Sequence, residues 1–269
     1  MSTAPAVITD NRLILCIIQR EPGVFIMVLI LHCGSADLLS LQNLICEFAM
    51  TTTVITGANR GIGLELARQT SARGDEVIAV CRHVSPELSR LDVRIVDGID
   101  VGTDSAVRDL SSLLSGSRID LLINNAGILT RQSLDNLDWG AMRAQYEVNS
   151  LGPLRVTSAL LPLLNRGAKV AIVTSRMGSV ADNTSGGHYG YRMSKAAVNV
   201  AGVSLARDLG PRGISVILLH PGYVSTEMTG HSGTVQPEDS ARGLLQRIDE
   251  LTLESSGEFR HMDGELLPW

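Results

Sequence analysis

The amino-acid sequence predicts an α/β protein built on a single doubly wound parallel sheet with helices on both faces. From Met50 onward, short apolar runs alternate with longer segments of helical period, which is the pattern of repeated β–α units. The apolar runs are continuous, as expected for parallel strands that are buried on both faces. The first run ends in a glycine-rich turn, Thr56–Gly63, that leads directly into a helical segment.

The individual elements follow in chain order. The first strand is expected at residues 53–56, because Val, Ile and Thr are β-branched and favour strands. The later apolar runs predict five further strands, at residues 76–81, 93–95, 119–123, 169–174 and 214–219. Apolar residues at helical spacing predict four helices, at residues 63–73, 104–115, 138–164 and 189–209. Pro153 and Pro162 should limit or kink the third helix, because proline cannot donate a backbone hydrogen bond.

Residues 1–49 differ from the rest of the chain. They contain two apolar runs, Leu13–Ile18 and Val24–Leu31, separated by a polar break. Neither run approaches the roughly 20 residues that span a bilayer, and no small-residue cleavage site follows the second run. We therefore expect an amino-terminal extension over residues 1–49 that is poorly ordered or not native, with a membrane anchor as the alternative. Residues 50–269 contain no repeat or linker and should form one domain.

The composition limits the classes of function. The formal net charge is −5 and aromatic residues make up 3% of the chain, so neither charge nor stacking capacity favours a nucleic-acid partner. Four cysteines without a Cys-x-x-Cys pair and six scattered histidines predict neither a disulfide framework nor a metal site. These features are typical of a reduced, cytoplasmic, metal-free protein.

The glycine-rich turn predicts a dinucleotide site. Gly57, Gly61 and Gly63 stand between the first strand and the first helix, where the backbone must approach a pyrophosphate closely. The N-terminus of the helix then offers free amides and a partial positive charge to the phosphates. A tight strand-to-helix connection without a ligand is the alternative for these glycines.

Two arginines favour NADP(H) over NAD(H). In dinucleotide-binding sheets, an acid at the end of the second strand binds the ribose 2′-hydroxyl, whereas a nearby arginine accommodates a 2′-phosphate. The second strand here ends without an acid and is followed by Arg82, while Arg60 lies within the glycine-rich turn. The alternative is that both are ordinary solvated arginines.

Tyr191 and Lys195 are the candidate proton-transfer pair. They stand four residues apart on a predicted helix and so share one face. An ammonium held beside a phenol stabilises the phenolate, which should lower the pKa of the tyrosine from its ordinary value of about 10. The phenol would then be a usable acid or base near neutral pH.

Together with several other motifs in the same order, these features resemble the short-chain dehydrogenase/reductase family over residues 50–269. The motifs are Thr56–Gly63, Asn124-Asn125-Ala126-Gly127, Asn149 in Val148–Gly152, Ser175 in Thr174–Gly178, Tyr191 with Lys195, Pro221–Thr226, and Asp100-Val101. The resemblance implies a Rossmann-type fold and a dinucleotide-binding oxidoreductase domain. It also implies NADP(H)-dependent hydride transfer that interconverts a carbonyl and an alcohol on a small-molecule substrate.

The resemblance assigns roles to single residues. Ser175 would hold the substrate oxygen, and Tyr191 would exchange a proton with it. Lys195 would lower the pKa of the tyrosine and hold the nicotinamide ribose, while Asn149 would hold a water for proton relay. Asn149 bracing a helix and Ser175 closing a turn are the alternatives. The implied cofactor-binding residues are Gly57, Asn59, Arg60, Gly61, Ile62, Gly63, Arg82, Asp100, Val101, Asn125, Ala126, Gly127, Tyr191, Lys195, Pro221, Gly222, Val224 and Thr226.

Two regions resemble one branch of the family more closely. The polar stretch between Ser175 and Tyr191 and residues 256–269 are similar to the C-factor-like branch, whose members are reductases or cell–cell signalling proteins. A nucleotide-binding signalling or regulatory protein with little turnover is therefore the alternative function. The loops at residues 176–190 and 223–236 should shape a fairly open substrate pocket. The family resemblance implies a homodimer or homotetramer.

Overall fold

The computed structural model describes residues 8–9, 13–18, 27–32 and 50–269. Its contacts divide the chain into two units, residues 1–49 and residues 50–269. In the first unit, β1 (Ile8–Thr9), β2 (Leu13–Ile18) and β3 (Met27–His32) form an antiparallel sheet in that order. Most of residues 1–49 lie outside the described residues, so the expectation that they are poorly ordered or not native stays a prediction.

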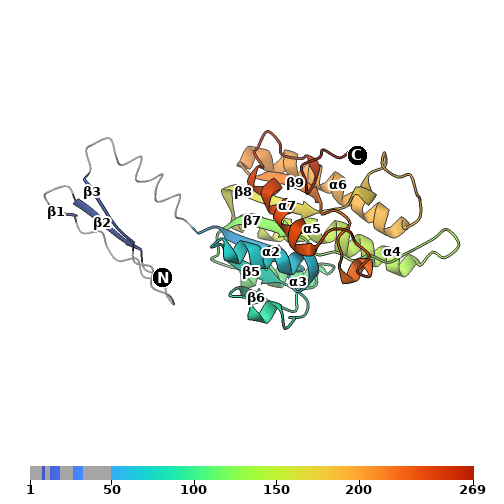
Figure 1. Ribbon diagram of the computed structural model, residues 1–269, viewed down its shortest axis with the longest axis horizontal. Helices are drawn as coiled ribbons and strands as arrows, with labels where there is room; N and C mark the ends of the chain where they lie inside the picture. Colours follow the sequence, from blue (N-terminus) through green and yellow to red (C-terminus); the bar gives the residue numbers. More distant parts are fainter. Residues whose placement is uncertain (1–7, 10–12, 19–26, 33–49) are drawn as a thin grey trace. The chain divides into compact units, whose positions relative to one another are not determined.

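Residues 50–269 form a seven-stranded parallel sheet in the order β10-β9-β8-β7-β4-β5-β6 (Figure 1). Its strands are β4 (Thr52–Thr56), β5 (Glu76–Val80), β6 (Arg94–Val96), β7 (Ile119–Asn124), β8 (Leu164–Val173), β9 (Ser215–His220) and β10 (Phe259–His261). The predicted doubly wound sheet is confirmed, and β10 extends it by one strand that was not predicted. The strand order reverses between β4 and β7, and open parallel sheets bind ligands at such a point.

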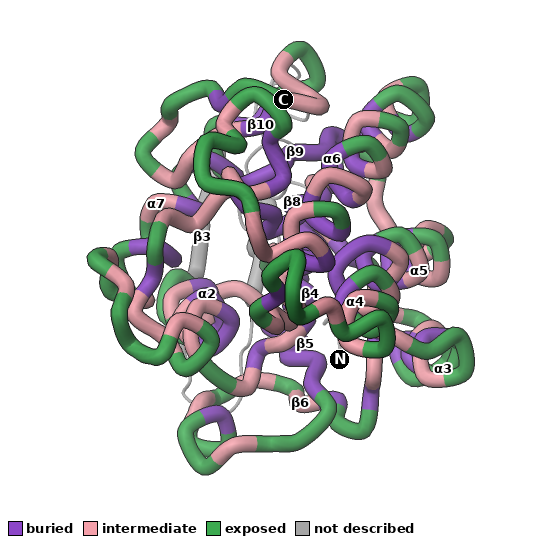
Figure 2. The backbone as a smooth tube through the Cα atoms, turned by 90° about the vertical axis from the view of Figure 1, so that its right-hand side faces the viewer, coloured by how far each residue is buried: buried purple, intermediate pink, exposed green. Residues whose placement is uncertain are grey.

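Helices cover both faces of this sheet. On one face lie α2 (Gly61–Ala72) and α7 (Pro237–Asp249), and on the other lie α3 (Asp104–Leu113), α5 (Gly152–Leu160) and α6 (Tyr189–Leu209). Neighbouring strand residues point to opposite faces. Val54 therefore packs in the α3–α5–α6 layer and Ile55 in the α2–α7 layer, both with 0% exposure. Figure 2 shows the buried residues concentrated along the strands between these layers.

The predicted helix at residues 138–164 is interrupted. It consists of α4 (Trp139–Tyr146), a π-helical turn (Glu147–Leu151), α5 and a 3₁₀ turn (Leu161–Leu163). Pro153 stands in the first turn of α5 and Pro162 stands in the 3₁₀ turn, so the prediction that the prolines limit this helix is confirmed. The π-helical turn was not predicted, and such turns are frequent at functional sites.

Candidate active site

A cavity of about 580 Å³ lies at the carboxyl ends of the central strands. Its wall is formed by residues that follow β4, β7 and β9, by the ends of β5 and β8, and by the starts of α2 and α6. The predicted cofactor-binding residues that line it are Gly57, Asn59, Arg60, Gly61, Ile62, Gly63, Arg82, Asp100, Val101, Asn125, Ala126, Gly127, Tyr191, Lys195, Pro221 and Thr226. The structure therefore brings residues that are widely separated in the sequence to one site.

The turn after β4 is shaped by close backbone packing. Gly57 has a φ of +67°, a conformation that glycine adopts without strain. A Cβ at Gly63 would lie 2.2 Å from the carbonyl oxygen of Gly57, so only glycine fits there. The Asn125 side chain donates hydrogen bonds to the carbonyl oxygens of Thr56 (3.0 Å) and Gly57 (3.2 Å). The Asn-Asn-Ala-Gly segment thus fixes the turn from the neighbouring strand.

The start of α2 fits a phosphate group. No side chain caps its first amides, and its first turn carries no acidic residue. Uncapped amides at a helix N-terminus are donors for an anion, and the helix dipole favours negative charge there. Asp100 lies farther along the cavity, where its Oδ1 accepts a hydrogen bond from the Gly102 amide (2.8 Å). Together with the glycine turn, this arrangement fits a dinucleotide.

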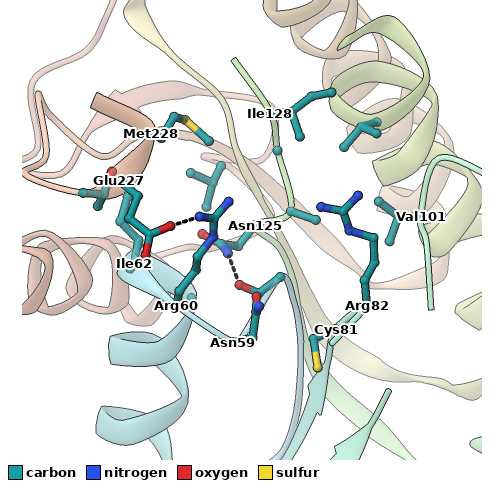
Figure 3. Close-up of a pocket in the computed structure, with 18 of the residues that line it drawn as sticks. Asn59, Arg60, Ile62, Cys81, Arg82, Val101, Asn125, Ile128, Glu227 and Met228 are labelled. Carbon is teal, nitrogen blue, oxygen red and sulfur yellow. Dashed lines mark hydrogen bonds and ion pairs between the residues drawn. The ribbon is translucent and has the colours of Figure 1, made fainter. Parts of the chain in front are cut away.

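The two arginines near the predicted 2′-phosphate position differ in their contacts. Arg60 forms an ion pair with Glu227, which belongs to the segment after β9 (Figure 3). Arg82 is exposed at the end of β5 and extends into the same cavity (Figure 3). Its side chain has neither a hydrogen bond nor an ion pair with the residues that the structure describes. The carboxylate of Glu227 is therefore part of the charge balance of this site. Its loop was predicted to shape the pocket, but no motif or periodicity marks the pairing with Arg60.

Tyr191 and Lys195 lie together in the first turns of α6. Their exposed fractions are 8% and 4%, so both reactive groups are almost fully removed from water. The Lys195 Nζ lies 5.8 Å from the centroid of the Tyr191 ring and donates a hydrogen bond to the Val173 carbonyl oxygen (2.9 Å). This bond fixes the ammonium at the end of β8, beside the phenol.

Burial controls the acidity of both groups. It raises the pKa of Tyr191 to about 12, an increase that the hydrogen bond with Ser175 opposes. It lowers the pKa of Lys195 to about 8. The net shift of the Tyr191 pKa is therefore upward, opposite to the predicted direction, because desolvation dominates. The hydrogen bond of Lys195 Nζ goes to the Val173 carbonyl oxygen. At neutral pH the phenol keeps its proton.

Ser175 follows β8 and reaches Tyr191 despite the wide interval between them in the sequence. Its side chain forms the hydrogen bond that lowers the pKa of Tyr191, and its Oγ also accepts a bond from the Met177 amide (3.1 Å). Ser175 is 6% exposed. It therefore both closes a turn, which was the alternative interpretation, and contacts the phenol.

Asn149 lies in the π-helical turn and does not line the cavity. Its Oδ1 accepts a hydrogen bond from the Ile128 amide (2.8 Å), and its Nδ2 donates to the Ile128 carbonyl (2.8 Å) and to Ser194 Oγ (3.0 Å). A Cβ at Gly127 would lie 3.3 Å from Asn149 Oδ1 and 3.7 Å from Lys195 Nζ. Asn149 thus braces the segment after β7 against α6, close to the lysine.

Two predicted cofactor-binding residues, Gly222 and Val224, do not line the cavity. Gly222 has a φ of +85° and forms the turn after β9, and Val224 is 4% exposed and pairs with Val235 in an isolated bridge. The lining residues that lie outside both the predicted site residues and the predicted pocket loops are Val80, Cys81, His83, Ile99, Ile128, Val148, Val173, Thr174 and Pro237. Many of these follow strand ends, so the rule that sheet ligands bind there would have found them.

The two loops expected to shape the substrate pocket differ in their position. Ser225, Glu227, Met228 and His231 of the second loop line the cavity, whereas residues 176–190 do not. In the first loop, Arg176 forms ion pairs with Asp182 (3.1 Å) and with Glu265 (2.6 Å). Residues after β10 therefore hold the segment that follows Ser175.

Within residues 50–269, no three His, Cys, Asp or Glu side chains gather as a metal site requires. Among the helices of the described part of the chain, none has the length and hydropathy of a membrane span.

Comparison of the sequence with known proteins identifies a family and several relatives. The family model described as short chain dehydrogenase matches residues 51–236. The 1-hydroxy-2-glutathionyl-2-methyl-3-butene dehydrogenase of Rhodococcus sp. (strain AD45) is 44% identical over 226 residues, which cover 82% of this chain and 100% of that protein. C-signal of Myxococcus xanthus is 51% identical over 154 residues, which cover 56% of this chain and 93% of that protein.

Solved structures show the same likeness. The NADPH-bound carbonyl reductase from chicken fatty liver has a TM-score of 0.76 and 29% identity, covering 82% of this chain and 100% of that one. A carbonyl reductase from Pseudomonas aeruginosa PAO1 in complex with NADP has a TM-score of 0.69 and 33% identity, with the same coverage of 82% and 100%. The chain therefore belongs to the short-chain dehydrogenase/reductase family of carbonyl–alcohol oxidoreductases, and its relatives include the C-factor-like branch.

Proposed function

We propose that this protein is an NADP(H)-dependent reductase of small-molecule carbonyl compounds, with Tyr191 as proton donor. The observation that carries the proposal is the hydrogen bond of Ser175 with Tyr191, which lines the cavity together with Lys195. Because burial raises the pKa of Tyr191 to about 12, the phenol is protonated at neutral pH. A protonated phenol suits reduction, in which the substrate oxygen must gain a proton.

Each residue of the proposed catalytic set has a separate task. When bound, the nicotinamide supplies the hydride for the carbonyl carbon. Ser175 donates a hydrogen bond to the substrate oxygen and orients it toward the phenol. Tyr191 then gives its proton to that oxygen. Lys195, whose pKa of about 8 leaves it mostly charged at neutral pH, stabilises the phenolate that forms.

Asn149 is a positioning residue in this scheme. Its side chain is fully used in bonds to Ile128 and Ser194, so it acts by fixing the backbone beside Lys195. Reprotonation of Tyr191 must proceed through a group that exchanges protons with solvent. We assign that part to Lys195, since its pKa lies near the working pH.

The preference for NADP(H) over NAD(H) rests on Arg82 and Arg60. Both line the cavity on the side of the glycine turn and β5, where the adenine ribose lies in dinucleotide-binding sheets. Arginine binds phosphate with two parallel hydrogen bonds. Similar structures from chicken fatty liver and Pseudomonas aeruginosa hold NADPH and NADP, which supports the same choice here.

The test is oxidation of NADPH and of NADH in the presence of aldehydes, ketones and quinones. The name of the Rhodococcus relative adds glutathione conjugates that carry a carbonyl, or an alcohol for the reverse reaction, to this panel. We expect turnover with NADPH, and a loss of about 10²-fold or more in kcat for Tyr191→Phe. Tyr189→Phe, two residues earlier on α6, is the matched control and should keep its activity. Equal activity of the Tyr191→Phe variant would contradict the proposal.

A second candidate function is that of a nucleotide-binding signalling protein with little turnover. It is favoured by the 51% identity with C-signal of Myxococcus xanthus. The intact Ser175, Tyr191 and Lys195 set speaks for the enzyme, because a purely binding role needs no phenol–ammonium pair. Tight NADPH binding by calorimetry without turnover on the whole panel would favour the signalling function.

A further inference from the structure

The ion pair between Arg60 and Glu227 joins two separate walls of the cavity. Arg60 belongs to the turn after β4, and Glu227 begins a short 3₁₀ turn (Glu227–Thr229) after β9. Both residues line the cavity, and their side chains are 55% and 64% exposed. Figure 3 shows the guanidinium of Arg60 directed at the Glu227 carboxylate. One of the two cavity arginines is therefore already matched by an acid of the protein itself.

The segment that carries Glu227 is held in place by its own bonds. The Thr229 hydroxyl donates to the Val224 carbonyl oxygen (2.7 Å) and accepts from the Thr226 amide (3.1 Å). A Cβ at Gly61 would lie 3.2 Å from Thr226 Cγ2, so this segment also packs against the start of α2. Glu227 is thus presented to Arg60 by a structured turn.

This arrangement has a consequence for cofactor choice, and it rests on the dinucleotide site proposed above. A 2′-phosphate that used Arg60 would have to displace the Glu227 carboxylate, and would then lie close to that like charge. A dinucleotide with a free 2′-hydroxyl lacks this phosphate, and its pyrophosphate is common to both cofactors, so the pair bears less on its binding. We propose that Glu227 is a specificity residue that competes with the 2′-phosphate for Arg60 and so moderates the preference for NADP(H) over NAD(H).

The test compares the dissociation constants of NADPH and NADH, measured by fluorescence titration of the full chain at low salt. For Glu227→Gln we expect NADPH to bind about three- to tenfold more tightly, in line with the loss of one exposed ion pair and one repulsion. NADH binding should change by less than about twofold, because NADH lacks the 2′-phosphate and an exposed carboxylate has little effect on the more distant pyrophosphate. The gain in NADPH affinity of Glu227→Gln should decrease as added salt screens the charges.

Glu238→Gln is the matched control. Glu238 is an acid of similar exposure that also pairs with an arginine, Arg242 (3.3 Å), and it does not line the cavity. Its removal changes the net charge equally, so it should leave both dissociation constants unchanged. If Glu238→Gln raised the NADPH affinity as much as Glu227→Gln does, the effect would come from the net charge of the protein alone. That result would overturn the proposal.

A double-mutant cycle isolates the pair itself. In an Arg60→Met background, Glu227→Gln should lose most of its effect on NADPH affinity. An undiminished effect in that background, or an equal change in NADPH and NADH affinity, would mean that Glu227 only closes the cavity, and would overturn the proposal. Wild-type protein that binds neither dinucleotide would contradict the proposed function as well, so the two failures are distinguishable.

Discussion

Lys195 and Tyr191 show how burial sets protonation at the scale of single residues. Both are nearly inaccessible to water, and burial moves the pKa of Lys195 down to about 8 and that of Tyr191 up to about 12. Each shift disfavours the charged form. At neutral pH the buried Lys195 is charged, so its desolvation lowers the free energy of unfolding. We expect this effect to appear as a pH dependence of the stability.

We predict that the stability of the protein rises with pH on account of Lys195. The pKa of Lys195 falls from 10.5 in the unfolded chain to about 8 in the folded one, so the unfolded chain binds more protons between these values. Stability is reduced below pH 8, and about 3 kcal/mol is regained by about pH 10.5. Urea unfolding of wild type and Lys195→Met should give a difference that grows in favour of wild type over this range. Parallel pH profiles would contradict the prediction.

The contacts of single residues explain which parts of the site the sequence could not predict. Tyr191 and Lys195 were predictable because helical spacing places them on one face. The pairing of Arg60 with Glu227 joins two loops far apart in the sequence, and no local pattern encodes it. The acidity of Tyr191 was predicted in the wrong direction, because it depends on burial by surrounding elements rather than on the lysine four residues away.

At the scale of elements, β4, α2 and the segment after β7 meet at one tightly packed junction. Gly63 lies where α2 crosses the turn, with no room for a side chain between the Gly57 carbonyl and Asn125. The same contact positions the uncapped amides of α2 toward the cavity. Stability and cofactor binding therefore depend on one glycine.

Gly63→Ala should lower both the free energy of unfolding and the affinity for NADPH. The added Cβ would lie 2.2 Å from the Gly57 carbonyl oxygen, so the backbone must shift, at a cost of about 1–3 kcal/mol or more. Gly210→Ala is the control, since no atom lies within 4 Å of its Cβ. Denaturant unfolding and NADPH titration measure both effects. If Gly63→Ala kept the wild-type free energy of unfolding and NADPH affinity, the turn would accommodate a side chain and the prediction would be wrong.

Elements were predictable where their sequence pattern was local. The continuous apolar runs of the inner strands predicted them correctly, and the two prolines predicted the interruption around α5. β8 begins at Leu164, earlier than predicted, because Leu164 pairs with Ile119; the residues between Leu164 and Lys169 have no strand pattern, and the register shifts there. β10 spans only Phe259–His261, too short for periodicity, and it forms because β9 offers it an edge. Helix α7 was missed although Pro237 and two acids mark its start.

At the scale of the whole molecule, an apolar stripe remains on the outer helices of the sheet. Met193 and Val200 on α6 are 60% and 70% exposed, and Trp139 and Tyr146 on α4 are 61% and 45% exposed. Each pair is seven residues apart, so its members lie on the same side of their helix. Exposed apolar stripes of this kind are typical of contacts between protein chains.

We therefore expect a homodimer or homotetramer that uses α4 and α6. Val200→Asp places a charge in the centre of this stripe and should shift the mass measured by light scattering toward the monomer, because an unpaired charge in an interface is strongly disfavoured. Leu253→Asp, at a position 50% exposed outside these helices, is the control and should leave the mass unchanged. A monomeric wild type, or a Val200→Asp variant of unchanged mass, would contradict this prediction.

The order of strands in the sheet also determines how long a newly synthesised strand lacks its native neighbour. β4, in the middle of the sheet, pairs on one side with β5 and on the other with β7, where Val54 meets Leu122. A ribosome adds the intervening residues, roughly 70 of them, in about 4–14 seconds. For that time one edge of β4, a strand whose five residues are all buried in the folded protein, has no native partner. The nascent chain therefore passes through a window in which chaperones, or neighbouring chains, compete for the future centre of the active site.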